Sequence, residues 1–157
     1  MKELHEKLKY KFIDKESELY HSAIELRYRE FYETSNRSRE SIFDEFEDKS
    51  LRVVAYMDHK DMDHKVVGHA RLFVEGNVGE ITQVVVDHEY RGYKIGAGII
   101  KQLFIKAEEL NLKSVGLDAR IPAVEFYKKF DFKIVGEEYI SPKSGMPIIR
   151  MEKSFRD

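Results

Sequence analysis

Apolar and polar positions alternate along this sequence with two different periods. Apolar residues recur every three or four positions over 14–33, 96–110 and 121–130, the spacing of amphipathic helices. Runs rich in β-branched and aromatic residues predict strands at 9–13, 51–57, 66–74, 78–86, 114–117, 132–135 and 148–151. A short helix is expected around 42–46. The pattern predicts one α/β domain.

Local signals refine the first helix. Asp14 is a plausible N-cap, because its side chain can accept a hydrogen bond from the first turn. An apolar stripe is then expected to pack against the sheet, formed by Tyr20, Ile24, Tyr28 and Phe31. At the other end of the chain, the strands at 132–135 and 148–151 are expected to pair.

The stretch 81–110 is the most informative part of the chain. Three consecutive valines, Val84, Val85 and Val86, are typical of a strand buried on both faces. A polar connector with Arg91 and Lys94 follows, and glycines then open a helix. The first turn of a helix offers free N–H donors and the positive end of the dipole. This order predicts a site for a phosphate-bearing ligand at the strand–helix junction.

Composition narrows the class of protein. The 157 residues fit one domain over 1–157, and 42% apolar content is typical of a globular chain. A net charge of -2 gives no basic footprint for nucleic acid. The absence of cysteine excludes a thiol nucleophile and a Cys-based metal site. No apolar run is long enough to span a membrane, and the polar N-terminus does not resemble a secretory signal. We therefore expect a cytoplasmic enzyme or binding domain.

The loop after the valines resembles motif A of the GNAT family, the GCN5-related N-acetyltransferases. The family pattern, Arg/Gln-x-x-Gly-x-Gly/Ala, is read here as Arg91-Gly92-Tyr93-Lys94-Ile95-Gly96, with Lys94 where the family usually has Gly. The segment 120–127 followed by Asp131-Phe132 resembles a second family motif, with Arg120 in place of Asn and Asp131 in place of Gly. The order of predicted elements is also that of the GNAT fold, a central mixed sheet flanked by helices.

This resemblance implies acetyl-CoA as the cosubstrate and no metal. The family's loop binds pyrophosphate, which here implicates Arg91, Gly92, Tyr93, Lys94, Ile95, Gly96 and Ala97. The pantetheine arm would pair with backbone groups of Val84 and Val86, and an amide near Val85 would face the thioester oxygen. A segment with two Asp-His pairs at 57–65 invites a metal interpretation, but its composition is that of a hairpin turn.

Two catalytic residues follow from the same resemblance. Family members often place a Tyr on the last helix to protonate the departing thiolate, and Tyr127 stands there; the alternative is a core tyrosine. Many members carry a Glu base where this chain has Thr82, which cannot act as a base at neutral pH. Glu80 lies two residues earlier, on the same strand face, and is the candidate base. The alternative is a solvated glutamate.

The resulting hypothesis is an N-acetyltransferase that acts on a small-molecule amine by direct attack, without a covalent enzyme intermediate. Arg27 and Arg29 would hold an acceptor carboxylate if they faced the site, but a solvated helix face is expected for them. Two alternatives stay open: a non-catalytic acyl-CoA-binding module, motivated by Thr82, and a protein-interaction domain that uses the Tyr20 stripe. Homodimers are common in the family.

Overall fold

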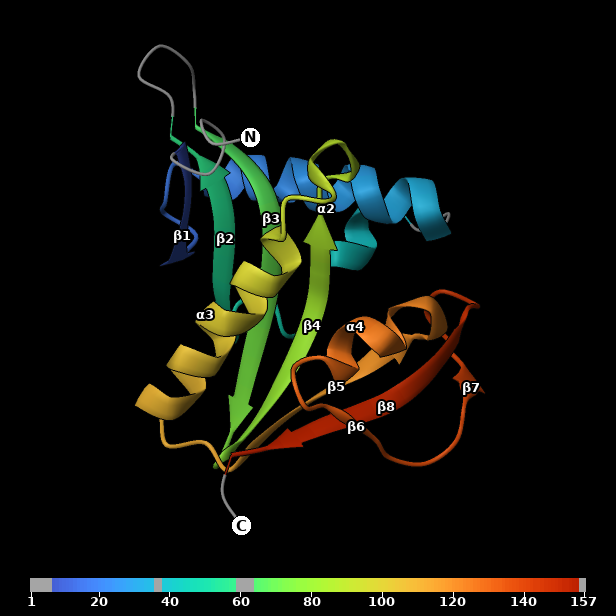
Figure 1. The fold of residues 1–157 in the computed structure, drawn as a ribbon. Helices are drawn as coiled ribbons and strands as arrows, with labels where there is room; N and C mark the ends of the chain where they lie inside the picture. Colours follow the sequence, from blue (N-terminus) through green and yellow to red (C-terminus); the bar gives the residue numbers. More distant parts are fainter. Residues whose placement is uncertain (1–6, 36–37, 59–63, 156–157) are drawn as a thin grey trace.

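The structure is a computed structural model that describes residues 7–35, 38–58 and 64–155. Within these residues the chain forms one eight-stranded mixed sheet in the order β1-β2-β3-β4-β5-β8-β6, with β7 also paired to β8 (Figure 1). The strands are β1 Leu8–Ile13, β2 Leu51–Met57, β3 Lys65–Glu75, β4 Val78–Val86, β5 Ser114–Arg120, β6 Lys133–Ile134, β7 Tyr139–Ile140 and β8 Pro147–Ser154. Among the strand pairs of these described residues, β4 and β5 are parallel and the others are antiparallel.

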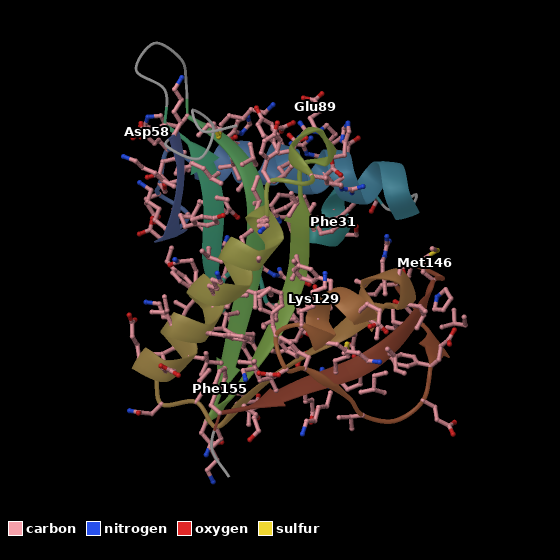
Figure 2. The ribbon with its side chains drawn as sticks, in the orientation of Figure 1. Phe31, Asp58, Glu89, Lys129, Met146 and Phe155 are labelled. Atoms are coloured by element: carbon pink, nitrogen blue, oxygen red, sulfur yellow. The ribbon has the colours of Figure 1, made fainter. Side chains whose placement is uncertain are left out.

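Helices cover both faces of the sheet. α3 (Ile95–Glu109) and α4 (Val124–Lys128) lie on one face, over the larger apolar core. α2 (Tyr20–Ser35) lies on the other face, where a smaller cluster joins it to β2, β3 and Val85 of β4. The terminal residue of the described chain, Phe155, is labelled in Figure 2 at the end where β4 begins. Its N–H donates to the carbonyl of Lys113, which fixes the end of β8 beside the start of β5.

Most predicted strands are confirmed. The turn at 75–77 is a tight hairpin, with Gly76 at φ 64 and Glu75 opposite Val78. The predicted pairing of the last strands is also confirmed, since Lys133 and Ile134 pair with β8. Asp131 adopts φ 68, the left-handed conformation that Asp tolerates better than most residues. The strand β7 was not predicted, and β5 extends three residues beyond the predicted strand end, to Arg120.

The helix predictions need corrections. Asp14 does not cap α2: its carboxylate accepts from the N–H of Glu16 in a separate turn, and α2 begins only at Tyr20. The helix expected around 42–46 is a 3₁₀ turn, η1, at Arg39–Ile42, followed by turns. The last helix is split into the 3₁₀ turn η3 (Ile121–Ala123) and α4, because Pro122 and the short segment favour a tight first turn.

The face that α2 buries is also different from the predicted one. The fully buried positions in and next to α2 are Leu19, Ala23, Leu26 and Arg27, while the predicted stripe lies at partly exposed positions. The helix therefore turns a mixed apolar and charged face to the sheet. No helix in the described residues is long and apolar enough to cross a membrane.

Candidate active site

The central feature of the site is the divergence of β4 from β5 (Figure 1). Their parallel pairing covers only Val78–Glu80 against Ser114–Gly116, although β4 continues to Val86. The Asp87 N–H donates to the carbonyl of Val67 on β3, and backbone groups point to alternate sides along a strand. Val86 and Val84 therefore direct their backbone groups to the opposite edge, where β5 has turned away. That edge can accept an extended ligand.

A β-bulge shapes the middle of β4. Gln83 adopts φ 50, and the register between β3 and β4 shifts between His69 and Arg71. Three contacts hold the bulge: Arg27 Nε donates to Gln83 Oε1 at 2.8 Å, Gln83 Nε2 donates to the Ile42 carbonyl at 3.1 Å, and His69 Nδ1 lies 2.9 Å from the Gln83 carbonyl. The bulge directs both Thr82 and Gln83 toward the α2 face.

The loop after β4 delivers unpaired amides to the same edge. Gly92 has φ 92, and Lys94 has φ 62 and ψ 28, so both residues are left-handed. The Gly98 N–H donates to the Lys94 carbonyl and is the first amide of α3 with an acceptor inside the helix. The amides of Ile95, Gly96 and Ala97 precede it and have no such acceptor. Together with the helix dipole they suit an anion.

The two side chains that add positive charge to this loop are accessible. Arg91 is 66% exposed, and its Nη2 lies 3.7 Å from Glu30 Oε1. Lys94 is exposed, while Tyr93 is partly buried against the larger core. The structure thus brings the predicted loop residues from Arg91 to Ala97 together around one helix start.

The two glycines of α3 also allow close packing. A Cβ on Gly96 would lie 3.2 Å from Phe126 Cζ and 3.9 Å from Val86 Cγ2. A Cβ on Gly98 would lie 2.1 Å from Tyr10 Oη. Gly96 therefore lets α4 approach the first turn of α3, and Gly98 makes room for the Tyr10 side chain from β1.

Tyr127 lies on α4, on the α3 side of the sheet. Its side chain is 8% exposed and packs edge-on against Phe126 and Phe132, with ring centroids 5.1 and 5.6 Å away. Burial raises the pKa of the phenol to about 12. The hydroxyl is therefore protonated at neutral pH and is a hydrogen-bond donor.

Glu80 lies on the opposite face, at the last residue pair before β4 and β5 separate. Arg150 Nη1 is 2.6 Å from Glu80 Oε2, and the two side chains are 29% and 31% exposed. Burial raises the pKa of Glu80, and Arg150 opposes that shift. A thioester held between β4 and β5 would have Tyr127 on one side and Glu80 on the other.

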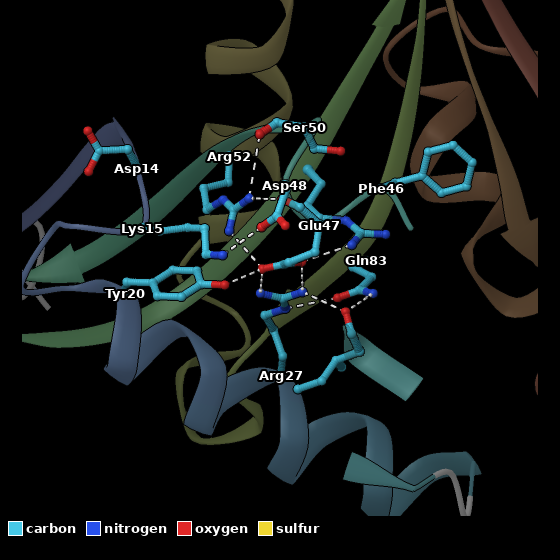
Figure 3. Close-up of polar contacts among 12 residues, drawn as sticks. Asp14, Lys15, Tyr20, Arg27, Phe46, Glu47, Asp48, Ser50, Arg52 and Gln83 are labelled. Carbon is cyan, nitrogen blue, oxygen red and sulfur yellow. Dashed lines mark hydrogen bonds and ion pairs between the residues drawn. The ribbon is translucent and has the colours of Figure 1, made fainter. Parts of the chain in front are cut away.

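The largest surprise is a buried charged cluster between α2 and the sheet (Figure 3), which we call the Glu47 cluster. Glu47 accepts hydrogen bonds within 2.9 Å from Tyr20, Arg27, Arg52 and Arg71. Arg71 also pairs with Asp44 through both of its terminal nitrogens at 2.9 Å. The expectation of a solvated Arg27 is wrong, because its side chain is fully buried in this cluster.

Arg29 differs from Arg27. It is 38% exposed, and its Nη2 lies 2.8 Å from Asp87 Oδ2. Asp87, Glu30 and His88 group their ligand atoms within 4.8 Å, but Arg29, Lys65 and Arg91 already pair with the two carboxylates. Most of the Asp-His segment at 57–65 lies outside the described residues.

Two groups were missed from the sequence. Arg150 was not assigned a role, although Gly116 gave a signal, because a glycine inside a strand marks close approach of another group. The Glu47 cluster had no sequence signal, since its members come from α2, the following loop, β2 and β3.

An open strand edge that leads to the first amides of a helix suits an extended ligand with a phosphate at its far end, and the comparisons identify the family. The family described as "Acetyltransferase (GNAT) domain" matches residues 10–155. The uncharacterized N-acetyltransferase YjcF of Bacillus subtilis (strain 168) is 28% identical over 142 residues, which cover 90% of this chain and 96% of that protein.

Solved structures show the same fold. A putative N-acetyltransferase from Lactobacillus plantarum superposes with a TM-score of 0.80 at 21% identity, over 94% of this chain and 97% of that chain. A GNAT family acetyltransferase from Elizabethkingia anophelis, with acetyl-CoA bound, superposes with a TM-score of 0.70 at 13% identity. The match covers 95% of this chain and 99% of that chain. The chain belongs to the GNAT family, which supports an acetyl-CoA-dependent N-acetyltransferase.

Proposed function

We propose that the protein transfers the acetyl group of acetyl-CoA to an amine of a small molecule by direct attack in a ternary complex. One observation carries the proposal: the free edge of β4 at Val84 and Val86 leads to the unpaired amides of α3. An extended thioester with a phosphate at its far end matches this geometry. The printed sequence has no cysteine, which disfavours an acyl-cysteine intermediate.

The proposed roles follow from the two faces of the sheet. On the α2 face, Glu80 accepts a proton from the acceptor ammonium, directly or through a water. The free amine attacks the thioester carbon, and an amide on the open edge, that of Val84 or Val86 beside Val85, stabilises the developing oxyanion. On the α3 face, Tyr127 donates a proton to the departing thiolate. The loop Arg91–Ala97 holds the pyrophosphate. A cytoplasmic location and a possible homodimer remain predictions.

A panel of amines assayed by thiol release tests the proposal. We expect turnover with at least one small-molecule amine, and initial-rate lines that intersect when both substrates are varied. Parallel lines would contradict direct attack. Turnover only with a protein or peptide amine would contradict the small-molecule acceptor.

The replacement of the usual Glu by Thr82 favours one alternative, a non-catalytic acyl-CoA-binding module. That function predicts an increase in melting temperature with acetyl-CoA, by mass action, without thiol release for any acceptor. The two measurements on one protein preparation separate the two functions. The interaction-domain alternative stays a prediction: Tyr20 donates to Glu47 and Phe31 packs against the smaller cluster, but the stripe of which they are part is partly exposed.

A further inference from the structure

Three adjacent strands form a bridge at the point where β4 and β5 separate. Glu80 on β4 stands beside Gly116 on β5, and Gly116 stands beside Glu152 on β8. Arg150, two residues before Glu152, sends its guanidinium across Gly116 to Glu80. A Cβ on Gly116 would lie 2.2 Å from Arg150 Nη2 and 2.8 Å from Cζ. Residue 116 must therefore be glycine for the guanidinium to lie where it does.

Arg150 contacts three carboxylates, and its shortest contact is with Glu80. Its Nη1 is 2.6 Å from Glu80 Oε2, its Nε is 3.2 Å from Glu152 Oε2, and its Nη1 is 3.7 Å from Asp118 Oδ1. Among the described residues, no hydrogen bond to Glu80 Oε1 is formed. One carboxylate oxygen is thus fixed by the guanidinium, and the other is left for a proton donor.

We propose that Arg150 is a positioning residue for the general base: its guanidinium, which lies across Gly116, holds Glu80 ionised and oriented at the separation of β4 and β5. This inference rests on the proposed role of Glu80. The proton passes from the acceptor ammonium to the Glu80 carboxylate. The amine nitrogen then bonds to the thioester carbon and the C–S bond breaks, while the second nitrogen proton passes to the departing thiolate through the Tyr127 hydroxyl.

The charged surroundings of Glu80 give Arg150 this importance. Burial raises the pKa of Glu80, and the negative charges of Asp118 and Glu152 raise it further. Arg150 is the group that lowers the pKa, through its hydrogen bond and its charge. Tyr139 of β7 also faces this group of side chains. Without the guanidinium, three influences in the same direction would favour a protonated and inactive Glu80.

The pH dependence of kcat tests the proposal. In Arg150→Gln, the acidic limb should move to higher pH by about one unit or more, since an opposite charge typically lowers a carboxyl pKa by that amount. The rate should recover toward that of the parent protein at alkaline pH. Gly116→Ala should produce a shift in the same direction with Arg150 still present, because the new methyl group displaces the guanidinium. Arg150→Lys should shift the limb less than Arg150→Gln.

Controls separate this role from loss of structure. Arg39→Gln removes an exposed arginine paired with Glu25 and should leave the limb unchanged. The ionisation of the acceptor amine contributes equally in all variants. A uniform loss of rate at every pH in Arg150→Gln, or an unshifted limb in Gly116→Ala, would overturn the proposal.

A second measurement does not depend on activity. Carbon NMR can follow the titration of the Glu80 carboxyl, assigned by its absence in Glu80→Gln. The midpoint should rise in Arg150→Gln and in Gly116→Ala; an unchanged midpoint would overturn the inference. If no acceptor is turned over, the proposed function fails, while this titration still decides whether Arg150 keeps Glu80 ionised.

Discussion

Arg27 Nη2 and Glu47 Oε1 form an ion pair of 2.5 Å in which the arginine side chain is fully buried and the glutamate 5% exposed. Arg27 also contacts Gln83 at the β4 bulge, so the pair connects the loop after α2 to the strand that carries the proposed site. Burial raises the pKa of Glu47, but Arg27, Tyr20 and Arg52 together outweigh it and hold the pKa well below its ordinary value.

Removal of the Glu47 charge should be strongly destabilising. Glu47→Gln leaves Arg27, Arg52 and Arg71 without their common carboxylate, and breaking a buried pair in this way costs about 3–5 kcal/mol. Arg27→Met should cost less, because the other two arginines still neutralise Glu47. Urea denaturation measures the free energy of unfolding. Arg39→Ala, at an exposed ion pair, is the control and should cost less than about 1 kcal/mol. Equal costs for the three variants would contradict the buried role.

His69 should make stability fall in mild acid. The ring is fully buried, and burial together with the charge of Arg27 lowers its pKa well below 6.5. The unfolded chain takes up this proton near pH 6.5 and the folded protein does not. The contribution is therefore fully present above pH 6.5 and is lost as pH falls, by up to about 1.4 kcal/mol per pH unit. The free energy of unfolding between pH 8 and pH 5 measures it.

Two histidine variants test whether His69 causes this dependence of stability on pH. His69→Asn keeps a donor for the Gln83 carbonyl and removes the titrating ring, so its stability should depend less on pH. His21→Gln removes a histidine whose side chain is 83% exposed and should retain the parent slope. A parent slope retained in His69→Asn would show that other groups titrate.

Gly96 and Gly98 should respond differently to alanine. Gly98→Ala places a methyl group on Tyr10 Oη and should destabilise the fold by roughly 1–3 kcal/mol, as overpacking does. The double change with Tyr10→Leu should restore part of this loss.

Gly96→Ala is tight only against Phe126, whereas Gly96→Asp adds a carboxylate beside the amides of α3. The shift in melting temperature with acetyl-CoA should survive in Gly96→Ala and vanish in Gly96→Asp. An undiminished shift in Gly96→Asp would sink the assignment of this loop.

Lys94→Gly should stabilise the protein. A residue with a Cβ loses roughly 1–2 kcal/mol in the left-handed conformation, and glycine avoids most of that strain. Part of the gain is offset, because glycine loses more backbone entropy on folding. Asn111→Gly, at φ 57, is a matched control with a smaller expected gain, since Asn tolerates this conformation. Thermal unfolding of both variants checks the order, and a Lys94→Gly protein less stable than the parent would contradict the strain.

Tyr127→Phe should lower turnover by about tenfold or more at saturating acceptor, since general-acid assistance is worth roughly 10²–10⁴-fold. The change keeps the ring packed against Phe126 and Phe132, so stability and acetyl-CoA affinity should change little. Phe126→Leu alters the neighbouring ring without removing a proton donor and serves as the control. Turnover within about twofold of the parent would make Tyr127 a packing residue.

The sequence was sufficient for features that depend on local pattern. The valine run, the loop from Arg91 and the helix after it are short-range, so their order was visible before the structure. Glu80 and Thr82 were correctly placed on one face, because strand alternation fixes it. The start of α2 was not predicted correctly, because Asp14 and Ser17 accept hydrogen bonds in turns that compete with the helix.

The hydrophobic pattern could not predict ion pairs between residues that are far apart in the sequence. Arg27 and Glu47 are 20 residues apart, and Arg150 and Glu80 are 70 apart. A charged residue on a helix is ordinarily solvated, and only the approach of several elements turned Arg27 inward. Gly116 alone indicated that another group lies close to a strand.

The short parallel pairing of β4 and β5 divides the backbone ladder of the sheet into two halves. Three residue pairs join a half built from β1 to β4 to a half built from β5 to β8, and the Lys113 N–H adds a backbone bond to the Asn77 carbonyl at the closed end. Beyond Glu80 and Gly116, the two strands form no further backbone pairs. An extended molecule that forms hydrogen bonds with the backbone of Val84 and Val86 would take the place of the missing strand partner. Its binding would then stiffen the protein, and the amides along the open edge would exchange with solvent more slowly.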